Sequence, residues 1–523
     1  MKTLSKSKLL AFRQCPKRLW LEVHKPEARV DSATSQAAFA TGHLVGDIAR
    51  SVYDPDALGR VLDVKALGVS GLLQQTQELL PQRRPIFEAG FQTTAPGGAL
   101  AISDVLLPSE GGAGDTWRMV EVKSSTEVKD YHLDDAAIQH HVASQAGVRL
   151  SGISLAHIDS TWVYPGGGDY QGLLVEEDLT DQSVARVDEV AKWIEQAHAV
   201  VESSVSPSSP VGKHCSKPFA CGFHAFCTEE DTAANGAIEH PVGLLPRVQA
   251  KALVRHLQRS EVRSVQDVPD LLLNPVQLRV KQQTLADTVY FDAASAAQAL
   301  KNFGLTGLFL DFETISPAVP VWAGTRPYQQ IPFQFSLHRL LATGHLTHTG
   351  FLDLSGNDPS LPFVNSLIAA CAGDEPIYVY NKGFEGARIQ ELANRWPNLA
   401  PGLNAIDQRL VDLLPITQKF YYHPAQRGSW SIKVVLPAIA PELNYQMLEG
   451  VQDGLGAQVA YGEAVNPETS QDRKEEIYKQ LWRYCRMDTF ATVRLWQILS
   501  GNPSVGGVND SAASLPCPNL GSL

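Results

Sequence analysis

A short, continuous run of apolar residues that ends in two acids is the most distinctive hydrophobic pattern in the chain. Residues 307–314 read Gly-Leu-Phe-Leu-Asp-Phe-Glu-Thr. Such a run predicts a central β-strand that is buried on both faces. Because side chains alternate along a strand, Asp311 and Glu313 are expected on one face and Phe312 in the core. Two adjacent carboxylates repel each other unless a cation lies between them, usually a hard divalent ion; two solvated acids at a strand end are the simpler alternative.

Further apolar segments in the second half of the chain predict the neighbours of this strand. Residues 331–338 and 377–380 predict strands, and residues 476–488 predict a late helix. Asn381 follows the second of these strands and is well placed to cap a helix, with Glu385 one turn further along.

The late helix brings polar residues to one face. Tyr484 and Asp488 lie four positions apart and therefore share a face, whereas Cys485 lies off that face and is expected to be buried. Upstream of this helix, residues 428–437 predict a loop. Its Lys433 could reach a phosphate or serve only in packing.

Three strand-like segments in the first half each carry an acid, and a turn is expected at residues 110–115. The three segments are residues 87–91, 101–107 and 117–124. Glu121 and Lys123 share a face of the last strand, and Asp104 lies on its hairpin neighbour. Two carboxylates can hold a cation that activates water, and a lysine beside them can stabilise developing charge. An exposed, salt-bridged hairpin is the simpler alternative.

Two basic segments could contact phosphate groups. The N-terminal segment has six basic residues before its first acid, Glu22: Lys2, Lys6, Lys8, Arg13, Lys17 and Arg18. A second helix is expected to begin at residues 245–246, with a basic residue at every fourth position. For both segments a solvated helix face is the interpretation that we favour over a phosphate-contacting face.

The composition indicates two large domains joined by a connector. The chain has 523 residues, 44% of them hydrophobic, which is enough for more than one core. We expect a first domain at residues 1–235, a helical connector at 236–304 and a second domain at 305–500. Residues 501–523 are rich in Gly, Ser, Asn and Pro, and predict a disordered tail.

The charge and hydropathy disfavour a strongly basic nucleic-acid-binding protein, a membrane-spanning protein and a secreted protein. The formal net charge is −12, so no global basic field attracts nucleic acid or anionic membranes, and local patches would have to do so. The chain contains no run of 18 apolar residues, and the basic N-terminus is not followed by the apolar part of a signal peptide. We therefore expect a cytoplasmic protein without membrane partners.

Four of the seven cysteines form a pattern typical of ligands. Three recur at a spacing of Cys-x5-Cys-x5-Cys and one lies far upstream; they are Cys215, Cys221, Cys227 and Cys15. Four thiolates suit an iron–sulfur cluster or zinc, and the lack of closer cysteine pairs disfavours zinc. His214 and His224 are substitute ligands, and Cys517 is excluded because it lies in the tail. Buried free cysteines are the simpler alternative.

Asp104 followed by Glu121-Val-Lys123 resembles the core motif of the PD-(D/E)XK nucleases, in their RecB-like branch. The resemblance implies a restriction-endonuclease-like fold for the first domain. It also implies Glu88 as an accessory acid and Gln139 as a helix glutamine of the catalytic site, with Glu88, Asp104 and Glu121 as metal ligands.

The cysteine pattern and two departures refine this resemblance. One distant N-terminal cysteine with three clustered ones resembles the iron–sulfur nucleases of CRISPR adaptation and of helicase–nuclease repair complexes, in which a 4Fe-4S cluster clasps the two ends of the domain. Such a clip closes a very long loop, where a cross-link removes the most chain entropy in the simple model. The branch's early-helix histidine is out of register near His43, and its tyrosine four residues after the glutamine is here Ala143. These departures imply a site that cuts slowly or binds without cutting.

Three motifs of the second half resemble the DEDDy branch of the RNase H-like 3′–5′ exonucleases. In order they are Asp-x-Glu on a strand, Asn-x-x-x-acid after a strand and Tyr-x-x-x-Asp on a late helix. The resemblance implies four acids that hold two metal ions and a tyrosine that orients the attacking water; these are Asp311, Glu313, Glu385, Asp488 and Tyr484. Glu385 stands where that family usually has aspartate, so Asp407 or Asp412 could compete for its role.

The two resemblances together imply an uncharacterised bacterial two-nuclease family. We expect a metal-dependent nuclease that uses Mg²⁺ or Mn²⁺ and acts on DNA rather than RNA, in repair or defence, with a helicase or repair complex as partner. The alternative is a nucleic-acid-binding scaffold with a degenerate first domain, or an RNA-processing exonuclease.

Overall fold

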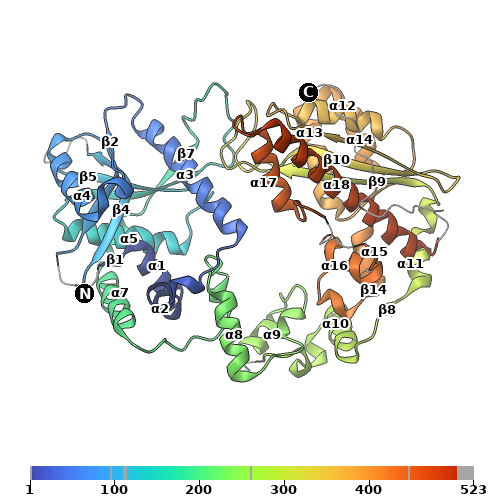
Figure 1. The fold of residues 1–523 in the computed structure, drawn as a ribbon, viewed down its shortest axis with the longest axis horizontal. Helices are drawn as coiled ribbons and strands as arrows, with labels where there is room; N and C mark the ends of the chain where they lie inside the picture. The colour runs from blue at the N-terminus through green and yellow to red at the C-terminus, as the bar shows by residue number, and fades with distance from the viewer. Residues whose placement is uncertain are drawn as a thin grey trace. The chain divides into compact units, whose positions relative to one another are not determined.

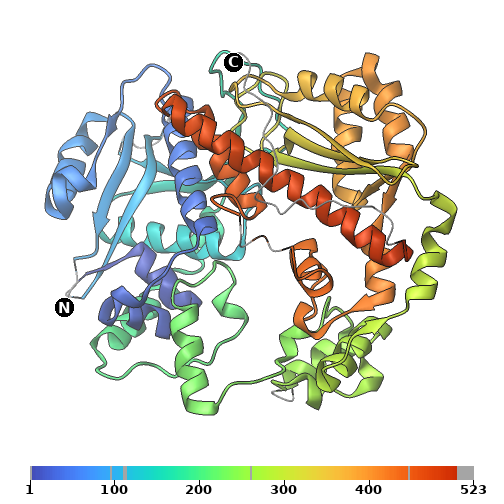
Figure 2. The ribbon, with the colours of Figure 1, turned by 45° about the vertical axis from the view of Figure 1, so that its right-hand side comes forward.

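The chain is mixed α/β and folds into two compact units (Figures 1 and 2). The computed structural model describes residues 3–94, 97–109, 115–259, 262–443, 445 and 448–502. The first unit comprises Met1–Ala237 and Pro317–Gln329, and the second comprises Ile238–Ser316 and Gln330–Leu523. The predicted connector is therefore part of the second unit. The turn expected at residues 110–115 lies, up to residue 114, outside the described residues, and so do the tail beyond residue 502 and its Cys517. No helix within the described ranges is long and apolar enough to cross a membrane.

The first unit is built on a mixed sheet. Among the described residues this sheet has seven strands in the order β2-β3-β4-β5-β6-β7, with β1 paired to β4. The strands are β1 (Leu4–Ser5), β2 (Arg60–Val61), β3 (Ile86–Gln92), β4 (Ala99–Pro108), β5 (Trp117–Lys123), β6 (Leu150–Ile158) and β7 (Leu174–Asp178). The helices are α1 (Lys6–Gln14), α2 (Pro16–His24), α3 (Ala33–Tyr53), α4 (Val64–Leu79), α5 (Asp130–Gln145), α6 (Thr180–Val184), α7 (Val187–Glu202) and α8 (His224–Asn235).

Both faces of β5 are covered, which explains its nearly continuous burial. Met119 belongs to the core that includes α5, whereas Val120 and Val122 belong to the core that includes α3. By alternation, Glu121 and Lys123 lie on the same face as Met119, toward α5. The predicted hairpin is therefore a buried part of the sheet, and the exposed, salt-bridged alternative is wrong for Glu121, which is 1% exposed.

The segment Pro317–Gln329 completes the first unit, although it follows β9 in the sequence. Ala318 and Val319 are buried with Phe87 and Val105 of the sheet. Its backbone also hydrogen-bonds to the loop after β6, where Tyr164 N donates to Thr325 O at 3.0 Å.

The second unit contains a five-stranded sheet within the part that the structure describes. Its order is β11-β10-β9-β12-β13; the pairs β11–β10 and β10–β9 are antiparallel, and the pairs β9–β12 and β12–β13 are parallel. The strands of the unit are β8 (Tyr290–Phe291), β9 (Gly307–Ile315), β10 (Ile331–Leu340), β11 (Leu346–Leu352), β12 (Ile377–Val379), β13 (Leu410–Asp412) and β14 (Tyr421–Tyr422). The helices are α9 (Lys251–Arg259), α10 (Pro275–Ala286), α11 (Ala293–Leu300), α12 (Ser360–Ala370), α13 (Lys382–Arg395), α14 (Ala400–Gln408), α15 (Leu413–Phe420), α16 (Ile432–Ile439), α17 (Gly454–Val465) and α18 (Gln471–Ser500).

Strand β9 is the central strand of this sheet, which confirms the prediction from its apolar run. Leu310 and Phe312 pack on one face against α12 and α13, whereas Phe309 packs on the other face against Trp496 of α18. Helix α18 lies along β9 and β10 (Figure 2). The alternation therefore places Asp311 and Glu313 on the face that α18 covers.

Two local predictions were wrong and a third was confirmed only in part. Residues 428–437, expected to form a loop, include the start of α16 at Ile432, so Lys433 lies on a helix. The helix expected to begin at residues 245–246 begins at Lys251, because Arg247 has a left-handed φ of 46° that interrupts a helix. Asn381 stands at the N-cap position of α13 but makes no capping hydrogen bond with its side chain. Its φ of 84° is left-handed, a conformation that asparagine tolerates better than most residues, and this explains the residue type.

Candidate functional site

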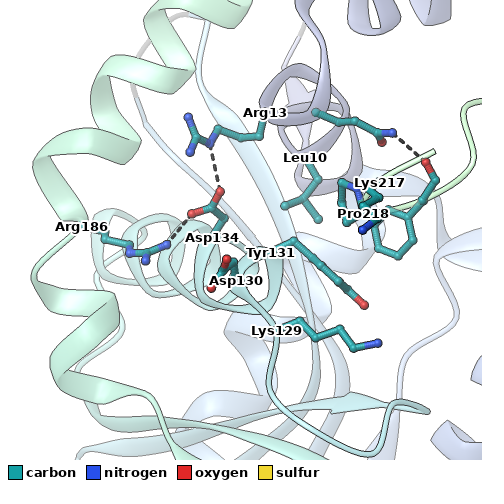
Figure 3. A pocket seen from close by; sticks show the side chains of 11 residues that line it. Leu10, Arg13, Lys129, Asp130, Tyr131, Asp134, Arg186, Lys217 and Pro218 are labelled. Carbon is teal, nitrogen blue, oxygen red and sulfur yellow. Dashed lines mark hydrogen bonds and ion pairs between the residues drawn. The ribbon is translucent and has the colours of Figure 1, made fainter. Parts of the chain in front are cut away.

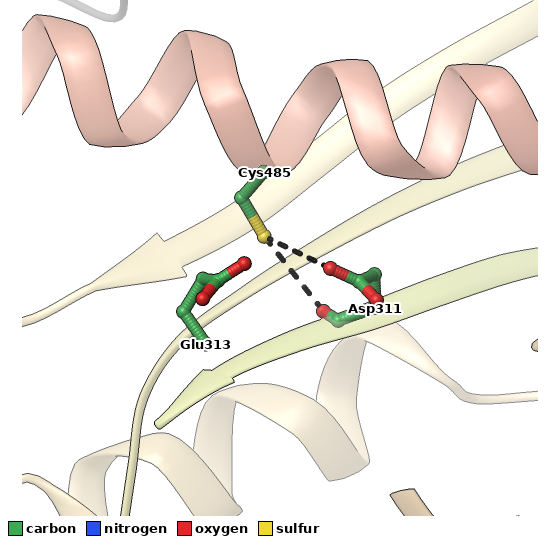
Figure 4. A group of neighbouring side chains, drawn as sticks. All are labelled: Asp311, Glu313 and Cys485. Atoms are coloured by element: carbon green, nitrogen blue, oxygen red, sulfur yellow. Dashed lines mark hydrogen bonds between the residues drawn. The ribbon is translucent and has the colours of Figure 1, made fainter. Parts of the chain in front are cut away.

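Four carboxyl groups, three of them buried and that of Asp311 half-buried, converge in the second unit from three elements. They are Asp311 and Glu313 of β9, Glu385 of α13 and Asp488 of α18, and are called the carboxylate cluster below. Asp311, Glu313 and Cys485 each offer a potential ligand atom, and these three atoms lie within 4.8 Å of one another (Figure 4). The structure thus brings together the four acids that the sequence singled out.

The electrostatics of the carboxylate cluster favour a bound cation. Burial and the nearby carboxyl groups of Asp488, Glu313 and Glu385 raise the pKa of Asp311 well above its usual value. Burial and Asp488 do the same to the pKa of Glu313. Burial raises the pKa of Glu385 to about 8, and its buried Oε2 has no hydrogen-bond partner among the described residues. Oxygen ligands held this close, without enough positive charge to offset them, suit a hard divalent ion.

A tyrosine pair and a lysine border the cluster. Lys433 Nζ donates a hydrogen bond to the Tyr484 hydroxyl, and Tyr445 donates to Asp488 Oδ1 at 2.6 Å. Burial raises the pKa of Asp488 to about 6, while Lys433, Tyr445 and Tyr484 hold it lower. Burial and the carboxyl groups raise the pKa of Tyr484, so its phenol stays protonated. The sequence predicted Tyr484 and left the role of Lys433 open; it missed Tyr445, which follows no recognisable spacing.

Cys485 lies closer to the acids than predicted. The residue is buried, as expected, but its thiol points at Asp311, with Sγ 3.8 Å from Oδ2 and 3.9 Å from the backbone oxygen (Figure 4). Burial and Asp311 raise the pKa of the thiol well above its usual value. Sulfur is a softer ligand than a carboxylate oxygen, so a hard ion at this place would prefer Asp311 and Glu313 to Cys485.

The two alternatives to Glu385 have other partners. Asp412 Oδ1 accepts hydrogen bonds from the backbone of Leu414 at 2.9 Å and of Asn381 at 3.0 Å, as the cap of α15. Asp407 Oδ2 accepts from Gln390 Nε2 at 3.0 Å. Of the three acids, only Glu385 contributes to the raised pKa of both Asp311 and Glu313, and the geometry therefore favours Glu385.

A second group of charged side chains lies in the first unit, between β5 and α5. Its members, called the lysine–carboxylate cluster below, are Asp104, Glu121, Lys123, Asp135, Gln139 and Lys6. Lys123 Nζ lies 2.5 Å from Glu121 Oε1 and 2.8 Å from Asp135 Oδ2. Gln139 Nε2 donates to the other oxygen of Glu121. The predicted residues Glu121, Lys123 and Gln139 therefore contact one another.

Asp104 joins this cluster where the sheet opens. The ladder between β4 and β5 ends at Val105 and Val120, and the Asp104 carboxylate accepts the next backbone N–H, from Val122, at 2.8 Å. Opposite Asp104, Glu88 of β3 has a left-handed φ of 60° and lies 3.5 Å from Arg50. Burial raises the pKa of both acids.

Lys6 and Asp135 are functional candidates that the sequence interpretation missed. Lys6 Nζ lies 2.7 Å from Glu121 Oε1 and 3.0 Å from Asp135 Oδ1. The prediction that the N-terminal basic residues form a solvated face is therefore wrong for Lys6. Asp135 precedes Gln139 by four residues on α5, and this spacing could have identified it. The basic N-terminal segment gave no signal that distinguished Lys6 from its neighbours.

The two lysines set the charge of the acids. Burial opposes ionisation of Asp135, but Lys123 and Lys6 hold its pKa well below the ordinary value. Burial, with Asp104 and Asp135, raises the pKa of Glu121 to about 7.

The two departures from the RecB-like pattern lie in different surroundings. Ala143, at the position where that branch has tyrosine, is fully buried in the core, and His43 is exposed on α3.

The four predicted cysteines line one small cavity. Cys15 lies between α1 and α2, Cys215 and Cys221 lie in the loop before α8, and Cys227 lies within α8. All four are free thiols and are called the thiol cluster below. His214 and His224 line the same cavity. Cys15 Sγ donates to Ser209 Oγ at 3.4 Å, and burial raises the pKa of Cys221 and Cys227.

Comparison with known proteins gives a partial match. Fold and sites together define a mixed α/β protein with a candidate metal-binding group in its second unit. Residues 308–431 match the model of a family described as a domain of unknown function, DUF2779. The matched range includes Asp311, Glu313 and Glu385, and ends before Tyr484 and Asp488. No curated protein matches the chain.

Proposed function

We propose that this protein is a metal-dependent nuclease whose second unit is an RNase H-like exonuclease of the DEDDy type. The observation that carries the proposal is the convergence of Asp311, Glu313, Glu385 and Asp488 in one buried cluster beside Tyr484. The mixed sheet, with three antiparallel strands and two parallel ones, is of the kind expected for such a domain.

The residues around the cluster have distinct roles in this proposal. Two Mg²⁺ or Mn²⁺ ions would polarise a phosphoryl oxygen and lower the pKa of a bound water. The four carboxylates would hold the ions, and the Tyr484 phenol would orient the attacking water. Lys433 fixes the position of Tyr484 through its hydrogen bond, and Tyr445 fixes Asp488. The products would be nucleotides released from a 3′ end.

The first unit is proposed to be a RecB-like PD-(D/E)XK domain with an iron–sulfur clasp. The contacts among Glu121, Lys123 and Gln139 support the nuclease core. The four thiols that line one cavity support the clasp, and the cysteine spacing favours an iron–sulfur cluster over zinc.

The substrate is proposed to be DNA in preference to RNA, in the cytoplasm, in repair or defence and with a helicase or repair complex as partner. These assignments rest on the two resemblances. The alternative role for the first unit is binding without cutting, which one observation favours: Lys6 and Lys123 both neutralise Glu121 and Asp135, where a metal ion would otherwise offset their charge.

Replacing Asp311 by asparagine tests the exonuclease. A bridging carboxylate offsets the repulsion between two ions, and an amide of the same shape does not. Asp311→Asn should lower single-turnover trimming of a 3′-end-labelled strand by at least about 100-fold, on the order of 3 kcal/mol in the barrier. Asp407→Asn is the matched control, because Asp407 lies outside the cluster. Trimming by Asp311→Asn at the wild-type rate would overturn the assignment.

Replacing Lys123 by alanine separates the two units. It should abolish internal cutting and leave end trimming intact, because Lys123 lies in the first unit only. Loss of both activities would contradict two independent sites. Absence of internal cutting already in the wild type, with DNA binding retained, would establish the binding role of the first unit.

A further inference from the structure

A mixed polar and aromatic pocket adjoins the lysine–carboxylate cluster, and neither proposed active site accounts for it. It has a volume of about 960 Å³ and lies between α1, the start of α5 and the loop before α8 (Figure 3). Its lining residues come from these elements and from the N-terminal side of α7; those used below are Arg13, Lys129, Tyr131, Arg186, Lys217 and Phe219.

The pocket concentrates positive charge in an acidic protein. Four cations line it, together with two acids, Asp130 and Asp134. Asp134 pairs with Arg13 at 3.0 Å and with Arg186 at 2.5 Å (Figure 3). Lys129 and Lys217 are exposed and form no ion pair with any residue that the structure describes. Two unpaired ammonium groups at the rim of a pocket suit anionic groups such as phosphates.

Two aromatic rings form part of the wall. Tyr131 and Phe219 meet edge to face, with their ring centroids 4.6 Å apart. Phe219 is 46% exposed, so its ring is accessible to a ligand. Gln14 holds this wall in place, because its Nε2 donates to the backbone oxygens of Phe219 at 2.8 Å and His214 at 2.7 Å. Exposed aromatic faces between cations are the usual platform for unpaired bases.

Helix α5 connects the pocket to the reactive groups. Tyr131, Asp135 and Gln139 follow one another at intervals of four residues and therefore share one face of the helix. Lys123 and Asp135 both influence the pKa of Tyr131, which burial raises, so the phenol lies near these charges. A chain held in the pocket would reach the lysine–carboxylate cluster one helical turn further along.

We propose that this pocket binds a single-stranded oligonucleotide and presents it to the lysine–carboxylate cluster. A base packs against Phe219 and Tyr131, and the flanking phosphates contact Lys129 and Lys217. A duplex fits poorly, because its bases are stacked on one another and are not available to Phe219. The inference deepens the proposed function of the first unit and rests on it. The inference also suggests a role for the thiol cluster: Lys217 and Phe219 lie between Cys215 and Cys221, so a group bound by these cysteines would fix the position of this part of the pocket wall.

Fluorescence anisotropy of the full-length protein tests the pocket. The probes are short fluorescein-labelled oligo(dT), oligo(rU) and a duplex of equal length, without divalent ions so that no strand is cut. Phe219→Ala should weaken single-strand binding about tenfold. Lys129→Gln should weaken it and reduce the slope of log affinity against log salt by about 0.7, the value for one phosphate contact.

Matched controls separate this effect from general changes of surface. Phe39→Ala removes another exposed phenylalanine, 55% exposed on α3, and Lys65→Gln removes an exposed lysine on α4. Both should bind like wild type. Lys129→Gln lies outside the loop before α8, so it keeps the test valid if Phe219→Ala disturbs that loop. Tighter binding of oligo(dT) would assign DNA and tighter binding of oligo(rU) would assign RNA; either supports the pocket.

The outcomes distinguish the pocket from the nuclease. If wild type binds single strands but cuts none, the proposed activity is overturned and the pocket stands. If wild type cuts, but Phe219→Ala and Lys129→Gln bind with wild-type affinity and salt dependence, the pocket is overturned and the nuclease stands. A duplex that binds more tightly than either single strand also overturns the pocket.

Discussion

At the scale of the residue, Glu385 shows how burial couples a candidate site to pH. The side chain is 2% exposed, and burial raises its pKa to about 8 from an ordinary value near 4.5. The folded protein therefore binds a proton at this group more tightly than the unfolded chain does. Its contribution to stability is present below the unfolded pKa and is lost as the pH rises toward 8.

We expect the metal-free protein to lose stability between about pH 5 and pH 8, and Glu385→Gln to lose less of it, because the amide is neutral throughout. In thermal melts of the metal-free proteins, the melting temperatures of wild type and Glu385→Gln should differ by a few degrees at pH 8. Glu391→Gln on the same helix is the control, because Glu391 is more exposed than Glu385 and its carboxylate pairs with Arg388. A parallel pH dependence in wild type and Glu385→Gln would contradict the assignment, and Mn²⁺ should flatten the wild-type curve.

The sequence predicted those site residues whose spacing is regular. Asp311, Glu313, Tyr484 and Asp488 recur at two- and four-residue intervals that place each pair on one face of a strand or helix. Lys6 and Tyr445 could not be found in this way. Lys6 reaches its acids from a distant helix, and nothing in the local pattern separates it from solvated lysines.

At the scale of the element, the loop before α8 meets the end of α1 and the start of α2. The thiol cluster lies where they meet, and Gln14 hydrogen-bonds to the same loop. The length of β9 was predictable because both of its faces are apolar over a continuous run. The start of α9 was not predictable, because Arg247 has a left-handed φ of 46° directly after a proline that normally suits a first turn.

Replacing Cys15 by serine should remove iron and acid-labile sulfide from anaerobically purified protein and lower its melting temperature. If the cluster acts like a cross-link worth about 2–4 kcal/mol, the shift should be on the order of 5–15 °C. Ser209→Ala is the control, because it removes the hydrogen bond of the Cys15 thiol but keeps all four thiols. Zinc alone, with no iron after reconstitution, would defeat the iron–sulfur assignment.

At the scale of the whole molecule, the first unit is discontinuous. The segment Pro317–Gln329 supplies buried apolar side chains to a core otherwise made by residues far earlier in the chain. Composition and length predicted two large domains, but not this exchange. The apolar residues of Pro317–Gln329 follow no helical or strand spacing, so the sequence alone does not distinguish this segment from an ordinary loop.

We expect Val319→Ala to destabilise the first unit by about 1–3 kcal/mol, because Val319 is 3% exposed in its core. Hydrogen exchange should speed up in β3 and β4, although the substituted residue lies between β9 and β10 in the sequence. Val321→Ala in the same segment is the control, since Val321 is 55% exposed. Faster exchange confined to β9 and β10 would contradict this assignment.

The discontinuous unit also determines the order in which the protein can be completed during synthesis. Domains generally fold as units, the N-terminal one first, as the chain leaves the ribosome. Here the first unit lacks part of its core until the ribosome has passed Gln329, after β9 has already been made. The apolar surface around Phe87 and Val105, which Ala318 and Val319 later cover, therefore stays exposed to solvent while the connector and β9 are synthesised. Any premature stop between residues 237 and 317 would leave that surface permanently open, a target for chaperones and proteases.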